Sequence, residues 1–225
     1  MKMWLRSIYY HVPEDVRQGI LVKRRSRQWL RGGIVFVHIP KAAGTSINEA
    51  LFGRFMGHAR ASDVEKWGSP ELKALPSFAV TRNPWDRLVS AYRFAKRGRG
   101  VGGARQAWVW RPEQYRIPEF ETFERFVGEW LVKRDVWRLD PMFRPQSEFV
   151  CDESGNLLVD HLGKLEDLQP TLDFVATTIA RSLCIKEANR SGERVDYRDF
   201  YTPELINLVG NVYRADVDRF GYGFE

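Results

Sequence analysis

The segment PKAAGTS, directly after the apolar run Ile34–Ile39, contains a lysine, two alanines, a glycine and two hydroxyl side chains, in that order. The loop that they form consists of Lys41, Ala42, Ala43, Gly44, Thr45 and Ser46. A helix that begins after a strand offers unpaired backbone N–H groups and a positive dipole end to an anion. The lysine adds a full charge, the hydroxyls add donors, and the small residues let an anion approach the backbone. The sequence therefore predicts a loop that binds a phosphate or phosphosulfate group.

A second pattern of this kind is RNPWDRLVSAY, at residues 82–92. Arg82 ends an apolar run, Pro84 is placed to begin a helix, and Ser90 lies two turns into that helix. Ligands of open α/β sheets bind at the carboxyl ends of strands. Two such loops side by side therefore predict a ligand with two separated anionic groups, such as a nucleotide with 5′ and 3′ phosphates. The alternative is that Arg82 only caps the helix or pairs with Asp86.

The two loops must be positioned by secondary structure, and the sequence predicts a repeated order of strand, loop and helix. Apolar runs predict strands over 34–39, 77–82 and 157–165. Helical spacing predicts helices over 45–55, 84–96, 122–133 and 168–183. A last helix has Thr202 as its N-cap and Pro203 in its first turn. This order predicts an α/β fold, a single P-loop-like three-layer domain with a central parallel sheet flanked by helices.

Two stretches depart from this order. Residues 1–33 are a basic N-terminal arm that precedes the domain of residues 34–225, and the arm is either a solvated basic helix or an electrostatic contribution to the adjoining loop. Within the domain, glycine, arginine and tryptophan follow no period over residues 97–118, in an insert that spans about 93–118. A stretch of that composition and length predicts a long, functional surface loop.

Charge and cysteine content narrow the classes of partner and compartment. The formal net charge of +6 favours an anionic ligand, a nucleic acid or an acidic membrane surface without choosing among them. Cys151 and Cys184 stand far apart with no pattern of metal ligands, so we expect no metal and reduced thiols, with one disulfide as the alternative. No apolar run is long enough for a transmembrane segment, and the first residues lack the apolar core of a signal peptide. These features predict a cytoplasmic protein.

The two loops also carry a resemblance. PKAAGTS followed by RNPWDRLVSAY resembles the paired 5′-phosphosulfate and 3′-phosphate loops of sulfotransferases that use 3′-phosphoadenosine 5′-phosphosulfate (PAPS), in the carbohydrate type that includes heparan and chondroitin sulfotransferases and bacterial relatives. PQSEFV, HLGKLEDL and the ending DFYTPELINLVGNVYRADVDRFGY are similar to later segments of that family. The resemblance thus extends from Val35 to Tyr222. It implies in-line transfer of a sulfuryl group from PAPS to a hydroxyl, with carbohydrates as the expected acceptors.

The resemblance implies a role for each matching residue. Residues 41–46 would hold the 5′-phosphosulfate, with Lys41 also stabilising charge on the departing phosphate. Arg82 and Ser90 would hold the 3′-phosphate. Gly163 and Lys164, at the end of the third strand, are further candidates for the nucleotide side of the cleft.

Transfer to a hydroxyl also needs a base that accepts its proton. His58 is our choice, because it lies in GHARASD between the two loops and related glycan sulfotransferases carry their base in a similar segment. His38 and His161 lie within predicted strands, where a structural role is expected. The alternative bases are three carboxylates beside the insert: Glu119, Glu121 and Glu124.

The insert is the predicted acceptor site. It holds seven basic residues against one acid, Glu113, with aromatic residues interleaved, which suits an acidic glycan. The residues that we expect to bind the acceptor are Arg105, Trp108, Trp110 and Arg111. Many relatives carry a histidine just before R-P-Q, where this chain has Met142 and Phe143, so the acceptor side departs from the family pattern.

Two other functions compete with this interpretation. A nucleotide kinase with a P-loop would need the G-x-x-x-x-G-K-[ST] pattern, which the chain lacks. A non-catalytic module that binds nucleic acid would explain the basic charge and the mixture of arginine with aromatic residues. It would not explain the ordered loops, so we expect no nucleic-acid partner.

Overall fold

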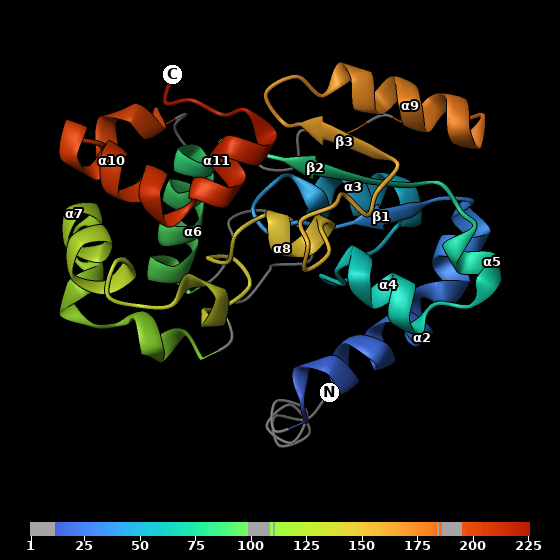
Figure 1. Cartoon of the computed structure of the whole chain (residues 1–225), viewed down its shortest axis with the longest axis horizontal. Helices are drawn as coiled ribbons and strands as arrows, with labels where there is room; N and C mark the ends of the chain where they lie inside the picture. The colour runs from blue at the N-terminus through green and yellow to red at the C-terminus, as the bar shows by residue number, and fades with distance from the viewer. Residues whose placement is uncertain (1–11, 99–108, 110, 184, 186–194) are drawn as a thin grey trace.

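A three-stranded parallel sheet lies at the centre of the protein (Figure 1). The computed structural model describes residues 12–98, 109, 111–183, 185 and 195–225. The strands are β1 (Val35–Val37), β2 (Ser77–Thr81) and β3 (His161–Lys164), in the order β1-β2-β3. Val35 pairs with Ser77, and Phe78 pairs with His161. The predicted α/β class and parallel sheet are therefore confirmed, with each strand shorter than its apolar run, whereas a P-loop-like identity of the sheet remains a prediction.

Both faces of the sheet are covered, which explains the continuous apolar run in β1. Val35 and Val37 face one side, where they pack with α2 (Glu14–Gly32), α4 (Ala61–Trp67), α5 (Pro70–Lys73) and α8 (Ser147–Val150). Ile34 and Phe36 face the other side, where they pack with α3 (Gly44–Phe52) and α9 (Gln169–Ile179). Figure 1 shows α9 above the sheet and α2, α4 and α5 below it. Alternation along one strand thus builds two separate apolar layers.

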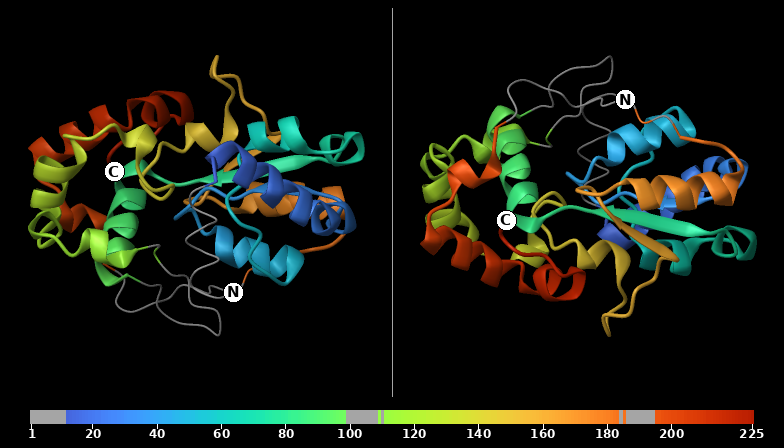
Figure 2. Two further views of the ribbon diagram at one scale, coloured as in Figure 1. Left: turned by 90° about the horizontal axis from the view of Figure 1, so that it is seen from below. Right: turned by 90° about the horizontal axis from the view of Figure 1, so that it is seen from above.

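A helical lobe packs beside the sheet and contains the largest apolar cluster (Figures 1 and 2). Its core is rich in aromatic side chains, among them Phe120, Phe126 and Phe143. Helix α6 (Pro84–Arg97) leaves the end of β2 and enters this lobe. The other helical elements are η1 (Pro112–Tyr115), η2 (Pro118–Phe120), α7 (Phe123–Arg125), the π-helix η3 (Phe126–Leu131), η4 (Val136–Arg138), η5 (Tyr197–Phe200), α10 (Pro203–Val212) and α11 (Arg214–Phe220).

Side-chain caps begin two predicted helices, and the cap at Thr202 was itself predicted. The Asn83 side chain accepts a hydrogen bond from the N–H of Trp85 at the start of α6, and Thr202 accepts one from Leu205 at the start of α10. Both helices have proline in their first turn. The predicted helix over 122–133 is divided into a short α-helical turn and a π-helix, which the spacing of apolar residues did not reveal.

The predicted N-terminal arm is, over Glu14–Gly32, a helix that packs on the sheet. Val22 and Trp29 of α2 are buried, and the helix ends at Gly33, whose φ of 69° is in the left-handed region. The basic stretch is therefore a helix built into the fold with one solvated side. No helix in the described part of the chain is both long and apolar enough to cross a membrane. Cys151 is a free, buried thiol.

Candidate active site

The first anion loop turns sharply between β1 and α3. Lys41 and Ala43 have φ angles of 70° and 54°, in the left-handed region that residues with a side chain rarely adopt. Residues held in such conformations cluster at ligand-binding sites. Helix α3 begins at Gly44, so its first N–H groups follow Lys41 at the carboxyl end of β1. This is the geometry in which a helix start can accept an anion.

Gly44 is required by packing as well as by the loop. A Cβ at this position would overlap the imidazole ring of His38. His38 is buried, and the Asn48 side-chain nitrogen lies 3.1 Å from its Nδ1. Burial lowers the pKa of His38 well below its ordinary value. His38 is therefore a neutral core histidine, as expected from its strand, and it sets the position of the start of α3.

The Lys41 side chain lies in a strongly positive environment. Burial, followed by the charges of Arg82, Arg97 and Arg87, lowers the pKa of Lys41 to about 7. Its ammonium lies 4.2 Å from the centre of the Phe94 ring. Repulsion among neighbouring cations is relieved when an anion binds between them. The electrostatics of the loop therefore favour an anionic ligand.

Arg82 joins the second loop to the first. Its Nη1 donates to the Lys41 carbonyl oxygen at 3.1 Å, while Nε and Nη2 donate to the Asp86 carboxylate at 2.8 and 2.7 Å. Gln146 holds the Arg82 backbone from both sides, by bonds of 2.9 and 2.8 Å to its N–H and carbonyl groups. The two predicted loops thus lie side by side, and the predicted structural alternative, an Arg82–Asp86 pair, is also present.

Arg87 is a residue of the site that sequence reasoning missed. Its side chain is buried on α6, where Nε donates to the Pro40 carbonyl at 2.9 Å and Nη1 to the Arg144 carbonyl at 2.9 Å. Its Nη2 is buried and has no hydrogen-bond partner in the described part of the chain. Arg87 therefore fixes the residue directly before Lys41. The signal in the sequence was an arginine at a position of α6 that helical spacing assigns to the apolar face.

His58 lies against the same loop. Its Nδ1 is 3.1 Å from the His38 carbonyl oxygen, and the two imidazole rings are 4.2 Å apart between centres. A neutral His58 donates its Nδ1 proton to that carbonyl, which leaves Nε2 as the proton acceptor. Burial, with smaller contributions from the charges of Lys41 and Arg87, lowers the pKa of His58 to about 4. The imidazole is therefore neutral at physiological pH.

A model of the sulfotransferase family matches residues 31–223. The chain belongs to the sulfotransferase family. The match spans both anion loops, His58 and the C-terminal helices, and it gives no support to a nucleotide kinase or a nucleic-acid-binding module. Neither the curated proteins nor the solved structures include a significant match.

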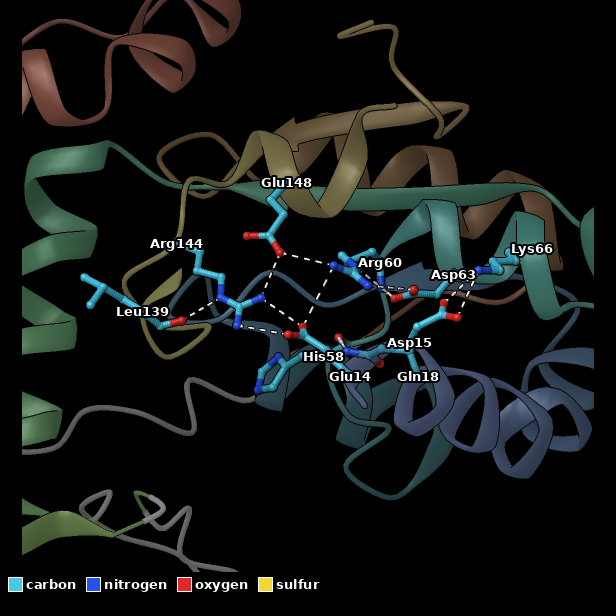
Figure 3. A network of polar contacts seen from close by, with 10 residues as sticks. All are labelled: Glu14, Asp15, Gln18, His58, Arg60, Asp63, Lys66, Leu139, Arg144 and Glu148. Atoms are coloured by element: carbon cyan, nitrogen blue, oxygen red, sulfur yellow. Dashed lines mark hydrogen bonds and ion pairs between the residues drawn. The ribbon is translucent and has the colours of Figure 1, made fainter. Parts of the chain in front are cut away.

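In this sulfotransferase a network of ion pairs supports the segment that carries His58 (Figure 3). Arg144 donates from Nη1 to Glu14 and to Glu148, at 2.9 Å each. Arg60 donates to Glu148 at 3.3 Å and to Asp63 at 3.0 Å. The network connects α2, α4 and α8 around His58, whose carbonyl also accepts a bond from Gln18. It was not predicted, because the pairs that link the helices, Arg144–Glu14 and Arg60–Glu148, join residues distant in the sequence.

Phe55 is a second residue of the candidate site that the sequence did not reveal. Its ring meets those of His38 and His58 edge-on, with centres 5.5 and 5.2 Å apart, and 43% of the residue is exposed. An exposed aromatic ring beside a candidate base offers an apolar surface to a second substrate. Its only signal in the sequence is its position three residues before His58.

The remaining nucleotide candidates lie at the carboxyl end of the sheet or on α6. Ser90 is partly buried on α6. Lys164 pairs in register with Thr81, and its Nζ donates to the Gly221 carbonyl at 3.2 Å. Packing requires glycine at position 163, because a Cβ there would overlap the Thr171 hydroxyl. Contacts of these residues with a nucleotide stay predictions.

The acceptor side is described only in part. Arg105, Trp108 and Trp110 lie outside the described residues, whereas Arg111 is exposed directly before η1. Met142 and Phe143, where many relatives carry a histidine, are buried in the core of the helical lobe.

The three alternative bases lie on the helical lobe. Glu119 belongs to η2 and Glu124 to α7, and Glu121, which stands between these elements, pairs with Arg125 at 3.0 Å. Within the described residues, no hydrogen bond or ion pair joins these carboxylates to Lys41 or His58. His58 is therefore the better placed candidate.

Proposed function

We propose that this sulfotransferase moves the sulfuryl group of PAPS to a hydroxyl of a carbohydrate, with His58 as general base. The observation that carries the proposal is the junction of the two loops, in which Arg82 binds the Lys41 carbonyl beside His58. A site of that kind suits a donor with two separated anionic groups. No metal enters the proposal, and the described residues include no group of three or more potential metal ligands.

The residues present fit the donor in charge and shape. Lys41 and Arg82 would face its anionic groups, and Arg87 holds a buried, unpartnered Nη2 in the same cationic cluster. Ala42, Ala43 and Gly44 keep side chains away from the start of α3. PAPS supplies an activated sulfuryl group with a phosphate as leaving group. We assign the 5′ side to residues 41–46 and the 3′-phosphate to Arg82 and Ser90, with Gly163 and Lys164 as further contacts.

His58 accepts the acceptor's hydroxyl proton at Nε2. The acceptor oxygen then bonds to sulfur as the sulfur–oxygen bond to the donor phosphate breaks, and the electron pair stays on that phosphate. Lys41 stabilises the charge that develops there. A pKa of about 4 makes free His58 a weak base, but an anion bound beside it raises this pKa and so strengthens the base.

A thermal-shift comparison tests the proposal directly. We expect 3′-phosphoadenosine 5′-phosphate (PAP), the product of the donor, to raise the melting temperature more than ATP or single-stranded RNA at equal concentration, because a ligand that binds only the folded state stabilises it. Stabilisation by RNA or ATP alone would contradict the donor assignment. Release of PAP from PAPS upon addition of acidic and neutral oligosaccharides then identifies the acceptor class.

Replacing Arg82 by alanine is expected to weaken PAP binding at least tenfold, since a hydrogen bond to a charged group contributes roughly 1.5–3 kcal/mol. Binding of AMP, which lacks the 3′-phosphate, should change little. Asp86→Ala is the matched control, because it removes the partner of Arg82 and leaves the guanidinium. Calorimetry measures each affinity. Equal losses of PAP affinity in both variants would mean that Arg82 has only a structural role, as the ion-pair partner of Asp86.

Replacing Arg105 and Arg111 by alanine is expected to raise the acceptor KM and to flatten its dependence on salt. Arginines bind an anionic glycan through charge, and the Debye length falls from about 10 Å at 0.1 M salt to about 3 Å at 1 M. PAP affinity should not change. The exposed Lys133 and Arg214, replaced together by alanine, control for the loss of two charges. A preference of the wild type for neutral sugars, with no effect of salt, would contradict an acidic acceptor.

A further inference from the structure

One side of α2 combines exposed apolar and basic side chains. Val16, Ile20 and Leu30 are 44%, 40% and 42% exposed. The residues of this outer face of α2 are Val16, Ile20, Lys23, Arg24, Arg27, Leu30 and Arg31, all of them exposed. At 3.6 residues per turn, their spacing places them within about a third of the helix circumference. In the left view of Figure 2, α2 lies in front of the sheet and no other labelled element of Figure 1 covers it.

The charge of this face is uniformly positive. None of its four basic side chains forms an ion pair with a carboxylate in the described part of the chain. The acids of the same helix are engaged elsewhere, since Glu14 binds Arg144 and Asp15 binds Lys66. Lys23 also places its ammonium 5.7 Å from the centre of the Trp67 ring.

The opposite side of α2 fixes the helix in the fold. Val22 and Trp29 are buried in the apolar layer below the sheet. Gly19 packs so closely on the Trp67 ring that a Cβ would meet it at 2.9 Å, and Arg25 donates to the Met56 carbonyl at 3.2 Å. The outer face is therefore presented by a helix that tertiary contacts hold in place.

We propose that the outer face of α2 binds the surface of an anionic lipid bilayer. A helix with apolar and basic residues on one side lies in the interface, with its apolar side chains among the acyl chains and its cations at the headgroups. A nucleic acid would engage the cations but leave Val16, Ile20 and Leu30 in water. A second copy of the chain would set like charges against one another. A bilayer is the surface that satisfies both kinds of side chain.

Vesicle flotation of the full chain tests this inference independently of sulfuryl transfer. We expect the protein to float with phosphatidylcholine vesicles that contain phosphatidylserine, and to float much less with phosphatidylcholine alone or at high salt. Arg24→Glu with Arg27→Glu should lower the partition constant at least tenfold, because each basic residue near an anionic bilayer contributes roughly fivefold. Val16→Ser with Ile20→Ser should lower it several-fold while leaving the charge unchanged.

Lys133→Glu with Arg214→Glu changes net charge as much as the first variant but lies outside α2, so it should float like the wild type. Circular dichroism and melting temperature establish that each variant is folded. Equal flotation with neutral vesicles, or equal loss in the control, would overturn the inference. So would tight binding of single-stranded RNA without flotation, or a dimer that dissociates when Val16 and Ile20 become serine.

Discussion

Replacing His58 by alanine is expected to lower turnover by roughly 10²–10⁴, the usual contribution of a positioned general base. The reason is specific to its geometry: Nδ1 is engaged by the His38 carbonyl at 3.1 Å, so Nε2 is the acceptor of the substrate proton. His58→Asn is the more informative variant. Its amide can still donate to the His38 carbonyl, but it cannot accept a proton at the position of Nε2.

PAP affinity should stay nearly unchanged in both His58 variants, so that the loss is confined to kcat. Turnover is measured as PAP formation with the best acceptor from the oligosaccharide panel. His161→Ala is a matched control, because that ring stacks on Phe174 at 4.6 Å and lies 3.1 Å from the Thr171 hydroxyl; we expect lower stability with little loss of turnover. Turnover like that of the wild type in His58→Ala would move the base to Glu119, Glu121 or Glu124.

The adjacency of the two loops could be predicted because it follows from the strands. Two parallel strands end at the same edge of a sheet, so Lys41 and Arg82 had to lie close together once their runs were assigned to neighbouring strands. The bond from Arg82 to the Lys41 carbonyl confirms this step. The helix start after Thr202 was equally local, since a cap and a proline define it within three residues.

Features that depend on contacts across the chain could not be predicted. Arg87 was hidden within an apolar helix face, and its partners are carbonyls of Pro40 and Arg144, which no pattern of side chains encodes. Gly44 must be glycine because a Cβ at this position would overlap the His38 ring. The pattern of the anion loop alone did not suggest this packing constraint. Local patterns specify where a loop begins, whereas distant backbone contacts specify how rigidly it is held.

Replacing Lys41 by alanine is expected to lower kcat by roughly 10²–10³, the cost of removing one preorganised charge from a developing anion, about 3–4 kcal/mol. The fold should survive, because within the described part of the chain the side chain packs on the Phe94 ring and forms no hydrogen bond or ion pair. A second expectation follows from its pKa of about 7 in the free protein. The charged form binds the donor, so PAP affinity should fall as pH rises through 7, by up to about tenfold per unit.

Bound anion favours the charged lysine and raises its pKa in the complex, so the alkaline fall in kcat should lie at higher pH than the fall in kcat/KM. Lys41→Arg separates charge from titration, because arginine stays charged throughout this range. We expect that variant to bind PAP with little change above pH 7, and Lys41→Ala to bind weakly at every pH. Calorimetry across the pH range measures these affinities. An alkaline fall that persists in Lys41→Ala would assign the titration to another group and remove Lys41 from donor binding.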